Sequence, residues 1–232
     1  MNSRQLTRVG QASLVGALLI LIIGGCQTAP RNSLATHNSS RWENAIATYE
    51  AQDVTNRPAP GCVVFTGSSF IRLWTNLVAD FPGLPVVNRG FGGCHLADVH
   101  NFADRIVIPY APRQVVIYAG GNDITSGKSP EAVFGDFVAL CKKLRAALPG
   151  VDIAFISCPP SPKRWSKTDE FRRVNALIAD YCHRNGMTYI NAFDRMLGED
   201  GLPLPDIYGE DQLHMNAQGY AIWREVVAPH LK

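Results

Sequence analysis

The chain of 232 residues lacks several patterns by which enzymes and binding proteins are recognised. It has no C-x-x-C pair, so its six cysteines do not have the spacing of a zinc site. It has no Gly-x-Ser-x-Gly sequence, which disfavours the nucleophile elbow of the α/β hydrolases. It has no internal repeat and no low-complexity tract. These absences leave a single ordinary globular domain as the simplest expectation for this length.

An excess of charge of one sign is also missing. The formal net charge is +2, and residues 1–25 contain Arg4 and Arg8 but no acidic residue. Removal of that segment would bring the net charge to zero. The rest of the chain therefore has no electrostatic basis for binding nucleic acid or anionic lipid.

The N-terminal segment has the pattern of an export signal. Arg4 and Arg8 precede an apolar run from Leu14 to Ile23, which is too short for a comfortable membrane span. The run ends at Gly24-Gly25-Cys26, which resembles the bacterial lipobox, in which the cysteine is lipidated. A plain secretory signal or a short anchor with an incidental cysteine is the alternative.

The lipobox pattern divides the chain into three parts. Residues 1–25 are expected to be a lipoprotein signal peptide, residues 26–40 a flexible tether attached to lipid through Cys26, and residues 41–232 the folded domain. Gln27, in place of an aspartate after the cysteine, resembles the pattern of proteins sent to the outer membrane. We therefore expect an anchored protein of the cell envelope, on the periplasmic face of the outer membrane.

Short apolar runs alternate with amphipathic stretches in the domain, which predicts a parallel sheet covered on both faces. The clearest helix should begin with Ser129 as N-cap and Pro130 as first residue, and end at Pro149-Gly150. The predicted strands are residues 63–65, 85–87, 115–118, 153–156 and 188–190.

Polar and glycine-rich segments follow the predicted strands. They are Gly67-Ser68-Ser69, Asn88 to Gly93, Gly120 to Asp123, and Asp211 to His214. Ligands of such sheets bind beyond the carboxyl ends of the strands. We therefore expect all four segments to meet at one edge of the sheet.

Together these segments contain the parts of a serine hydrolase. A serine hydroxyl needs a base, a group that orients the base, and donors for the developing oxyanion. Ser69 is the candidate nucleophile, His214 the base and Asp211 its orienting carboxylate. The N–H groups of Ser69 and Gly90 and the side-chain amide of Asn122 are the candidate oxyanion donors.

On these motifs the chain resembles the SGNH, or GDSL-like, hydrolases from about Val63 to Tyr220. Gly67-Ser68-Ser69 matches the Gly-Asp-Ser block with serine in place of aspartate, Gly90 matches the second block, and the remaining two blocks match Gly120–Asp123 and Asp211–His214. The chain is similar to the lipase/acylhydrolase branch related to platelet-activating-factor acetylhydrolases. That resemblance implies a three-layer α/β/α sandwich with a flavodoxin-like five-stranded parallel sheet.

The expected function is therefore that of a serine esterase without metal or cofactor. It would cleave a carboxylic ester with a short acyl group, such as acetyl, on a glycan or lipid. Two alternatives stay open: a metal-dependent phosphoesterase using Asp123, Asp211 and His214, and a non-catalytic lipoprotein that binds glycan or lipid in a vestigial pocket. Taken singly, Ser69 could be only the N-cap of a helix running towards Asp80.

Other residues give weaker signals. His95 and His100 do not have the spacing of a metal pair and are expected near the surface or behind the site. Pro159 to Glu170 should form a loop at the same edge, as surface or as a lid in which Arg164 and Trp165 touch substrate. The cysteines other than Cys26 are expected to be buried small hydrophobic residues: Cys62, Cys94, Cys141, Cys158 and Cys182.

Overall fold

The computed structural model describes residue 34 and residues 37–232. The predicted signal peptide, the lipidation of Cys26 and most of the predicted tether lie outside the described residues. The last part of that tether packs on the domain: His37 Nε2 lies 2.7 Å from Asp98 Oδ1, and Ser39 is buried. The folded domain thus begins before residue 41, where the sequence had placed its start. Within the described part of the chain, no helix has the length and apolarity needed to cross a membrane.

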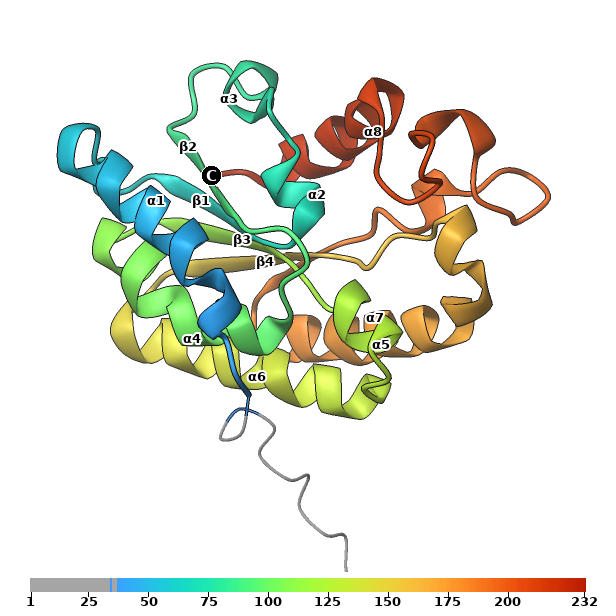
Figure 1. Cartoon of the computed structure of the whole chain (residues 1–232), viewed down its shortest axis with the longest axis horizontal. Helices are drawn as coiled ribbons and strands as arrows, with labels where there is room; N and C mark the ends of the chain where they lie inside the picture. The colour runs from blue at the N-terminus through green and yellow to red at the C-terminus, as the bar shows by residue number, and fades with distance from the viewer. Residues whose placement is uncertain (1–33, 35–36) are drawn as a thin grey trace, which may run out of the picture.

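The centre of the domain is a five-stranded parallel sheet, as predicted (Figure 1). The strand order is β2-β1-β3-β4-β5, the flavodoxin-like order that the family resemblance implied. The strands are β1 (Val63–Gly67), β2 (Val86–Gly90), β3 (Gln114–Tyr118), β4 (Asp152–Ile156) and β5 (Thr188–Ile190).

The strands are apolar because both faces of the sheet are buried. Side chains alternate along each strand, so Val64 of β1 joins the hydrophobic cluster on one face while Val63 and Phe65 join the cluster on the other. In β3, Ile117 and Tyr118 divide in the same way. Side chains on both faces of these central strands are therefore buried.

Helices cover both faces and complete the three predicted layers. In Figure 1, α4, α5, α6 and α7 lie below the sheet, and α2, α3 and α8 lie above it; α1 runs obliquely from the level of β1 down to α4, which it contacts. The helices are α1 (Glu43–Thr55), α2 (Ser69–Arg72), α3 (Leu77–Asp80), α4 (Leu96–Ile106), α5 (Gly121–Thr125), α6 (Pro130–Ala147), α7 (Thr168–Arg184) and α8 (Ala217–Val227). The predicted start of α6 is confirmed, because the Ser129 hydroxyl accepts a hydrogen bond from the N–H of Ala132 at 3.2 Å.

The segment after β1 differs from the expected continuous helix. It forms two four-residue helices, α2 and α3, with the buried Trp74 between them. The Ile71 carbonyl, which a longer helix would use, accepts instead from Asn88 Nδ2 at 2.6 Å and from the N–H of Trp74 at 3.0 Å. A single turn has only a small dipole, so any support for a negative charge near Ser69 must come from nearby N–H groups.

The five cysteines of the described chain are buried and free of disulfide bonds. Burial raises the pKa of the Cys158 thiol to about 12. The prediction that these cysteines act as small hydrophobic residues is confirmed.

Candidate active site

The candidate nucleophile follows the end of β1 at a position where only glycine fits. Gly67 adopts φ +130°, and a Cβ at this residue would lie 1.7 Å from the carbonyl oxygen of Tyr118 in β3. The N–H of Ser68 then donates to that same carbonyl at 2.8 Å. The turn therefore leaves the sheet tightly beside β3 and places Ser69 at the first position of α2.

Three residues predicted to cooperate are in hydrogen-bond contact. Ser69 Oγ lies 2.9 Å from His214 Nε2, and His214 Nδ1 lies 2.6 Å from Asp211 Oδ2. A carboxylate only accepts hydrogen bonds, so the contact with Asp211 requires the proton on Nδ1. His214 Nε2 is then free to accept the proton of the Ser69 hydroxyl. Ser69 and His214 are 145 positions apart in the sequence, and the fold brings their side chains into contact.

The Asp211 carboxylate is held by its own loop. Its Oδ1 atom accepts from the N–H groups of Leu213 at 3.0 Å and His214 at 2.9 Å, which leaves Oδ2 for the imidazole. Desolvation raises the pKa of Asp211, but these hydrogen bonds outweigh it and lower the pKa to about 2. Asp211 is therefore ionised at neutral pH and can stabilise a positive charge on His214.

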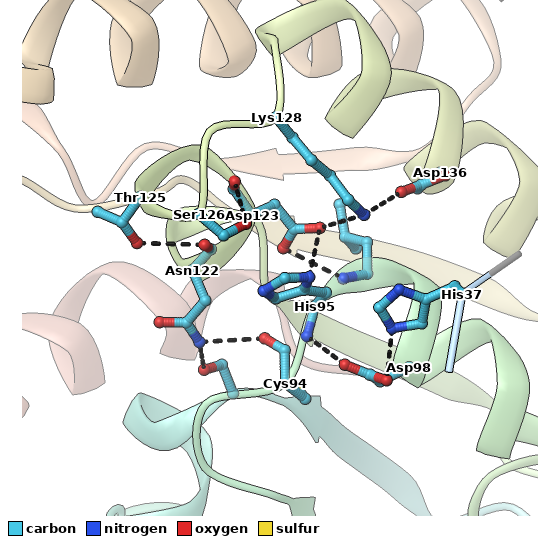
Figure 2. Close-up of polar contacts among 12 residues, drawn as sticks. His37, Cys94, His95, Asp98, Asn122, Asp123, Thr125, Ser126, Lys128 and Asp136 are labelled. Atoms are coloured by element: carbon cyan, nitrogen blue, oxygen red, sulfur yellow. Dashed lines mark hydrogen bonds and ion pairs between the residues drawn. The ribbon is translucent and has the colours of Figure 1, made fainter. Parts of the chain in front are cut away.

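Asn122 lies at the start of α5, next to the candidate nucleophile. Its Nδ2 atom donates to Ser68 Oγ at 2.6 Å and to the Cys94 carbonyl at 3.0 Å (Figure 2). Its Oδ1 atom accepts from Arg164 Nη2 at 2.8 Å. The arginine fixes which end of the amide is the oxygen, so the N–H₂ group is turned towards the serines.

The backbone donors differ in part from those predicted. In the described part of the chain the N–H of Ser69 donates to no other group, as befits the first residue of a helix. The N–H of Gly90, in contrast, donates to Asn88 Oδ1 at 2.9 Å and is not free for an oxyanion. Gly90 has a packing role instead, since a Cβ there would lie 2.4 Å from the N–H nitrogen of Arg72. The N–H groups of Gly92 and Gly93 make no hydrogen bond within the described residues, and both glycines line the cavity.

Ser69 and His214 open into a cavity of about 690 Å³. Helix α1, which the sequence had not connected with the site, forms one wall of it. The lining residues are Trp42, Ala45, Thr48, Tyr49, Gln52, Ser69, Arg72, Gly90, Phe91, Gly92, Gly93, Asn122, Arg164, Leu213 and His214. The cavity is large enough for a small ester together with part of a larger alcohol or acyl group.

The segment from Pro159 to Glu170 reaches the site, as predicted for a rim, but it is not a loop throughout. Pro162–Lys167 form a 3-10 helix, and Thr168 begins α7. The N–H of Lys163 donates to the Gln212 carbonyl at 3.0 Å and so ties this segment to the loop that carries His214. Arg164 lines the cavity, whereas Trp165 is absent from its lining. His100 is also absent from the lining, and its backbone carbonyl accepts from Lys143 at 2.9 Å.

A different group of side chains brings three possible metal-ligand atoms close together. His37, His95 and Asp98 offer ligand atoms within 4.8 Å of one another, and among the described residues they are the one such group of three. The sequence had missed it because His37 lies far from His95 along the chain. The residues of the alternative phosphoesterase site are not assembled in this way: the Asp123 carboxylate is buried and lies 3.1 Å from Lys128 Nζ (Figure 2).

Comparisons with known proteins give the family of the chain. Residues 32–222 match the model of the GDSL-like Lipase/Acylhydrolase family. The chain belongs to this family. Its members are ester hydrolases in general, so this protein is a hydrolase that acts on esters. A search of curated protein sequences gave no match.

Solved structures show the same fold. A protein of Streptococcus pneumonia whose description names platelet activating factor has a TM-score of 0.74 and 17% identity, over 83% of this chain and 94% of that one. A GDSL-like lipase from Bacteroides thetaiotaomicron has a TM-score of 0.64 and 24% identity, over 83% and 96%. A lipase/acylhydrolase from Enterococcus faecalis has a TM-score of 0.56 and 14% identity, over 74% and 97%.

The departure from the family motif has a structural consequence. Ser68, which stands where the motif has aspartate, is buried and accepts the Asn122 amide through Oγ. A hydroxyl accepts this bond as an aspartate oxygen would, but without a charge beside the nucleophile. Neither Ser68 nor Arg164 had been predicted as a partner of Asn122, because no sequence spacing connects them.

Proposed function

We propose that the protein is a serine esterase that works through an acyl-enzyme at Ser69. The observation that carries the proposal is the continuous chain of hydrogen bonds from Ser69 through His214 to Asp211. This chain also favours an active enzyme over a vestigial binding pocket, since a pocket that only binds needs no aligned base.

In the first half of the proposed reaction, Ser69 Oγ attacks the ester carbonyl carbon while its proton passes to His214 Nε2. The oxyanion is stabilised by the N–H of Ser69 and, in place of Gly90, by the unbonded N–H groups of Gly92 and Gly93. Asn122 Nδ2 joins them when the oxyanion replaces Ser68 Oγ as the acceptor of one of its two N–H groups. The bond to the alcohol oxygen then breaks, and His214 returns the proton to the departing alcohol. The acyl group stays on Ser69.

In the second half, His214 takes a proton from water, and the water oxygen attacks the acyl carbon. The bond to Ser69 Oγ breaks, Oγ regains a proton from His214, and the carboxylic acid leaves. Asp211 stabilises the imidazolium that forms in both halves. We propose a short acyl group such as acetyl from the resemblance to platelet-activating-factor acetylhydrolases. We propose a glycan or lipid as its carrier from the expected location in the cell envelope.

Nitrophenyl esters of increasing acyl length, together with acetylated sugars, test this proposal. Ser69→Ala should lower kcat on every ester by about 10⁴ or more, since it removes the nucleophile. An organophosphonate should label the wild type at Ser69 and leave Ser69→Ala unlabelled. Ser126→Ala is the matched control, because its hydroxyl bonds only the Asp123 carbonyl and lines no part of the cavity. Wild-type turnover by Ser69→Ala would refute the mechanism.

We also propose that Cys26 is lipidated and holds the enzyme on the outer membrane, facing the periplasm. The support is the sequence pattern of residues 14–27. Metabolic labelling with a fatty acid should mark the wild type but not Cys26→Ala, and membrane fractionation should find the variant released. Equal labelling of both proteins would contradict the proposal.

A further inference from the structure

The charged side chains that line the cavity beside Ser69 are all positive. Its lining contains the guanidinium groups of Arg72 and Arg164 and no carboxylate. The Arg41 guanidinium is also close, because its Nη2 atom donates to the Gly93 carbonyl at 3.1 Å and its Cζ lies 4.6 Å from the centre of the Trp42 ring. The acidic residues of the neighbouring helix α1 are occupied elsewhere. Glu50 pairs with Arg105, and Asp53 pairs with Arg89.

Arg72 is placed to meet a ligand bound at Ser69. It lies three residues after Ser69 in α2, and side chains at this spacing share one side of a helix. Its guanidinium lies over Gly92, where a Cβ would be 2.6 Å from Nε. In the described part of the chain, Arg72 has neither an ion-pair partner nor a hydrogen bond from its guanidinium. Its positive charge is therefore not matched by a carboxylate of the protein.

Arg164 approaches the other side of the nucleophile. One of its nitrogens, Nη2, donates to Asn122 Oδ1, and its Nη1 would lie 3.2 Å from a Cβ at Gly121. A guanidinium has five N–H donors, and only this one is used among the described residues. The remaining donors are available next to the amide that we place in the oxyanion hole.

We propose that this cavity selects esters that carry a negative charge, a carboxylate or a phosphate, and that Arg72 and Arg164 bind it. Guanidinium groups form paired, charge-assisted hydrogen bonds with the oxygens of both anions. Trp42, Phe91 and Leu213 give the same cavity apolar walls. The preferred substrate is thus amphipathic, with an anionic group within reach of the ester. This inference rests on the esterase function proposed above and names the class of its substrate.

Matched pairs of anionic and neutral esters test the inference. The acyl-side pair shares its leaving group, and the alcohol-side esters share their acetyl group. The mono-4-nitrophenyl ester of adipic acid carries the charge on the acyl side, and its methyl ester is the neutral partner. 3-Acetoxybenzoate and 3-acetoxyphenyl phosphate carry the charge on the alcohol side, with methyl 3-acetoxybenzoate as neutral partner. We expect at least one anionic ester to exceed its neutral partner in kcat/KM by about tenfold. The ester with the largest ratio shows whether the charge belongs on the acyl or the alcohol side, and whether a carboxylate or a phosphate is preferred.

Variants of Arg72 and Arg164 test whether these two side chains cause the preference for anionic esters. In Arg72→Gln the ratio of anionic to neutral kcat/KM should fall by about tenfold, and Arg72→Lys should retain part of it. Arg164→Gln should lower the ratio as well as kcat on neutral esters, because it also orients Asn122. Arg57→Gln is the matched control: its guanidinium donates to the Pro109 carbonyl and lines no part of this cavity, so the ratio should not change. Raising the NaCl concentration should reduce the preference.

Two results would overturn the inference while leaving the esterase intact. One is rapid hydrolysis of neutral esters with no preference for any anionic partner. The other is an anionic preference that survives in both Arg72→Gln and Arg164→Gln. Failure of the wild type to hydrolyse any ester, combined with no labelling of Ser69, would instead overturn the proposed function itself.

Discussion

Replacement of Asn122 by alanine is the sharpest test of the oxyanion hole. The side chain makes three hydrogen bonds, to Ser68 Oγ, to the Cys94 carbonyl and from Arg164 Nη2. The variant removes the amide that we expect to meet the negative oxygen of the intermediate. It leaves the hydrogen bonds among Ser69, His214 and Asp211 in place, since none of these residues is hydrogen-bonded to Asn122.

Asn122→Ala should lower both kcat and the free energy of unfolding, for separate reasons. Loss of one oxyanion donor costs about 10²–10³ in kcat, or about 2.7–4 kcal/mol of transition-state stabilisation. Loss of the partner of the Cys94 carbonyl should cost about 1–3 kcal/mol of folding stability, because this carbonyl would lose a hydrogen bond. The effect on KM should be small, because the oxyanion exists only in the transition state and the intermediate.

Initial rates on 4-nitrophenyl acetate and urea unfolding separate the two effects. Asn185→Ala is a matched control, because it also removes a side-chain amide bonded to a carbonyl, that of Tyr181, at the end of α7 and outside the cavity. It should lose stability without loss of kcat. Asn122→Asp should be at least as inactive as Asn122→Ala, since a carboxylate repels the oxyanion. A folded Asn122→Ala enzyme with kcat within about threefold of wild type would refute the assigned role.

Four further predictions follow from other contacts. Asp211→Asn should lower kcat by about 10⁴ on nitrophenyl esters, because the imidazole would lose the acceptor that sets its tautomer. The folded pKa of Asp211 is about 2, below the ordinary 3.8, so the stabilisation by this carboxylate is present above pH 3.8 and lost towards pH 2; unfolding titrations of wild type and Asp211→Asn should therefore converge in acid. Lys128→Met should destabilise the fold by about 3–5 kcal/mol in urea, because it leaves the buried carboxylates of Asp123 and Asp136 without the cation that lies 3.1 and 2.8 Å away; no loss of stability would contradict this. Gly67→Ala should not give a stable protein, since the new Cβ would overlap the backbone of β3; thermal unfolding at the wild-type temperature would contradict the prediction.

The architecture and the position of Ser69 after β1 were predictable because they depend on local patterns. Apolar runs of strand length mark β1 to β5, and Ser129-Pro130 marks the start of α6. The carboxyl ends of parallel strands share one edge, so Ser69 and His214 could be expected to meet there.

The details of the oxyanion hole could not be predicted in the same way. Gly90 was predicted as a donor because a glycine lets the backbone approach the substrate and because it matches the family's second block. The Asn88 side chain, however, accepts its N–H. The helix after Ser69 looked continuous, but Asn88 also takes the Ile71 carbonyl that would continue it. Both outcomes depend on one amide side chain whose direction the sequence does not specify.

By itself the sequence determined the sheet, its covering helices and the four segments that bring a serine, a histidine, an aspartate and an asparagine to one edge. Periodic burial and the geometry of parallel strands are general, so they can be deduced without coordinates. Only the tertiary structure decided which N–H groups are unbonded, that α1 forms a wall of the cavity, and that Arg72 and Arg164 line it without a carboxylate. These properties arise from contacts between side chains that are distant in the chain, and their partners are fixed only when the whole domain has packed.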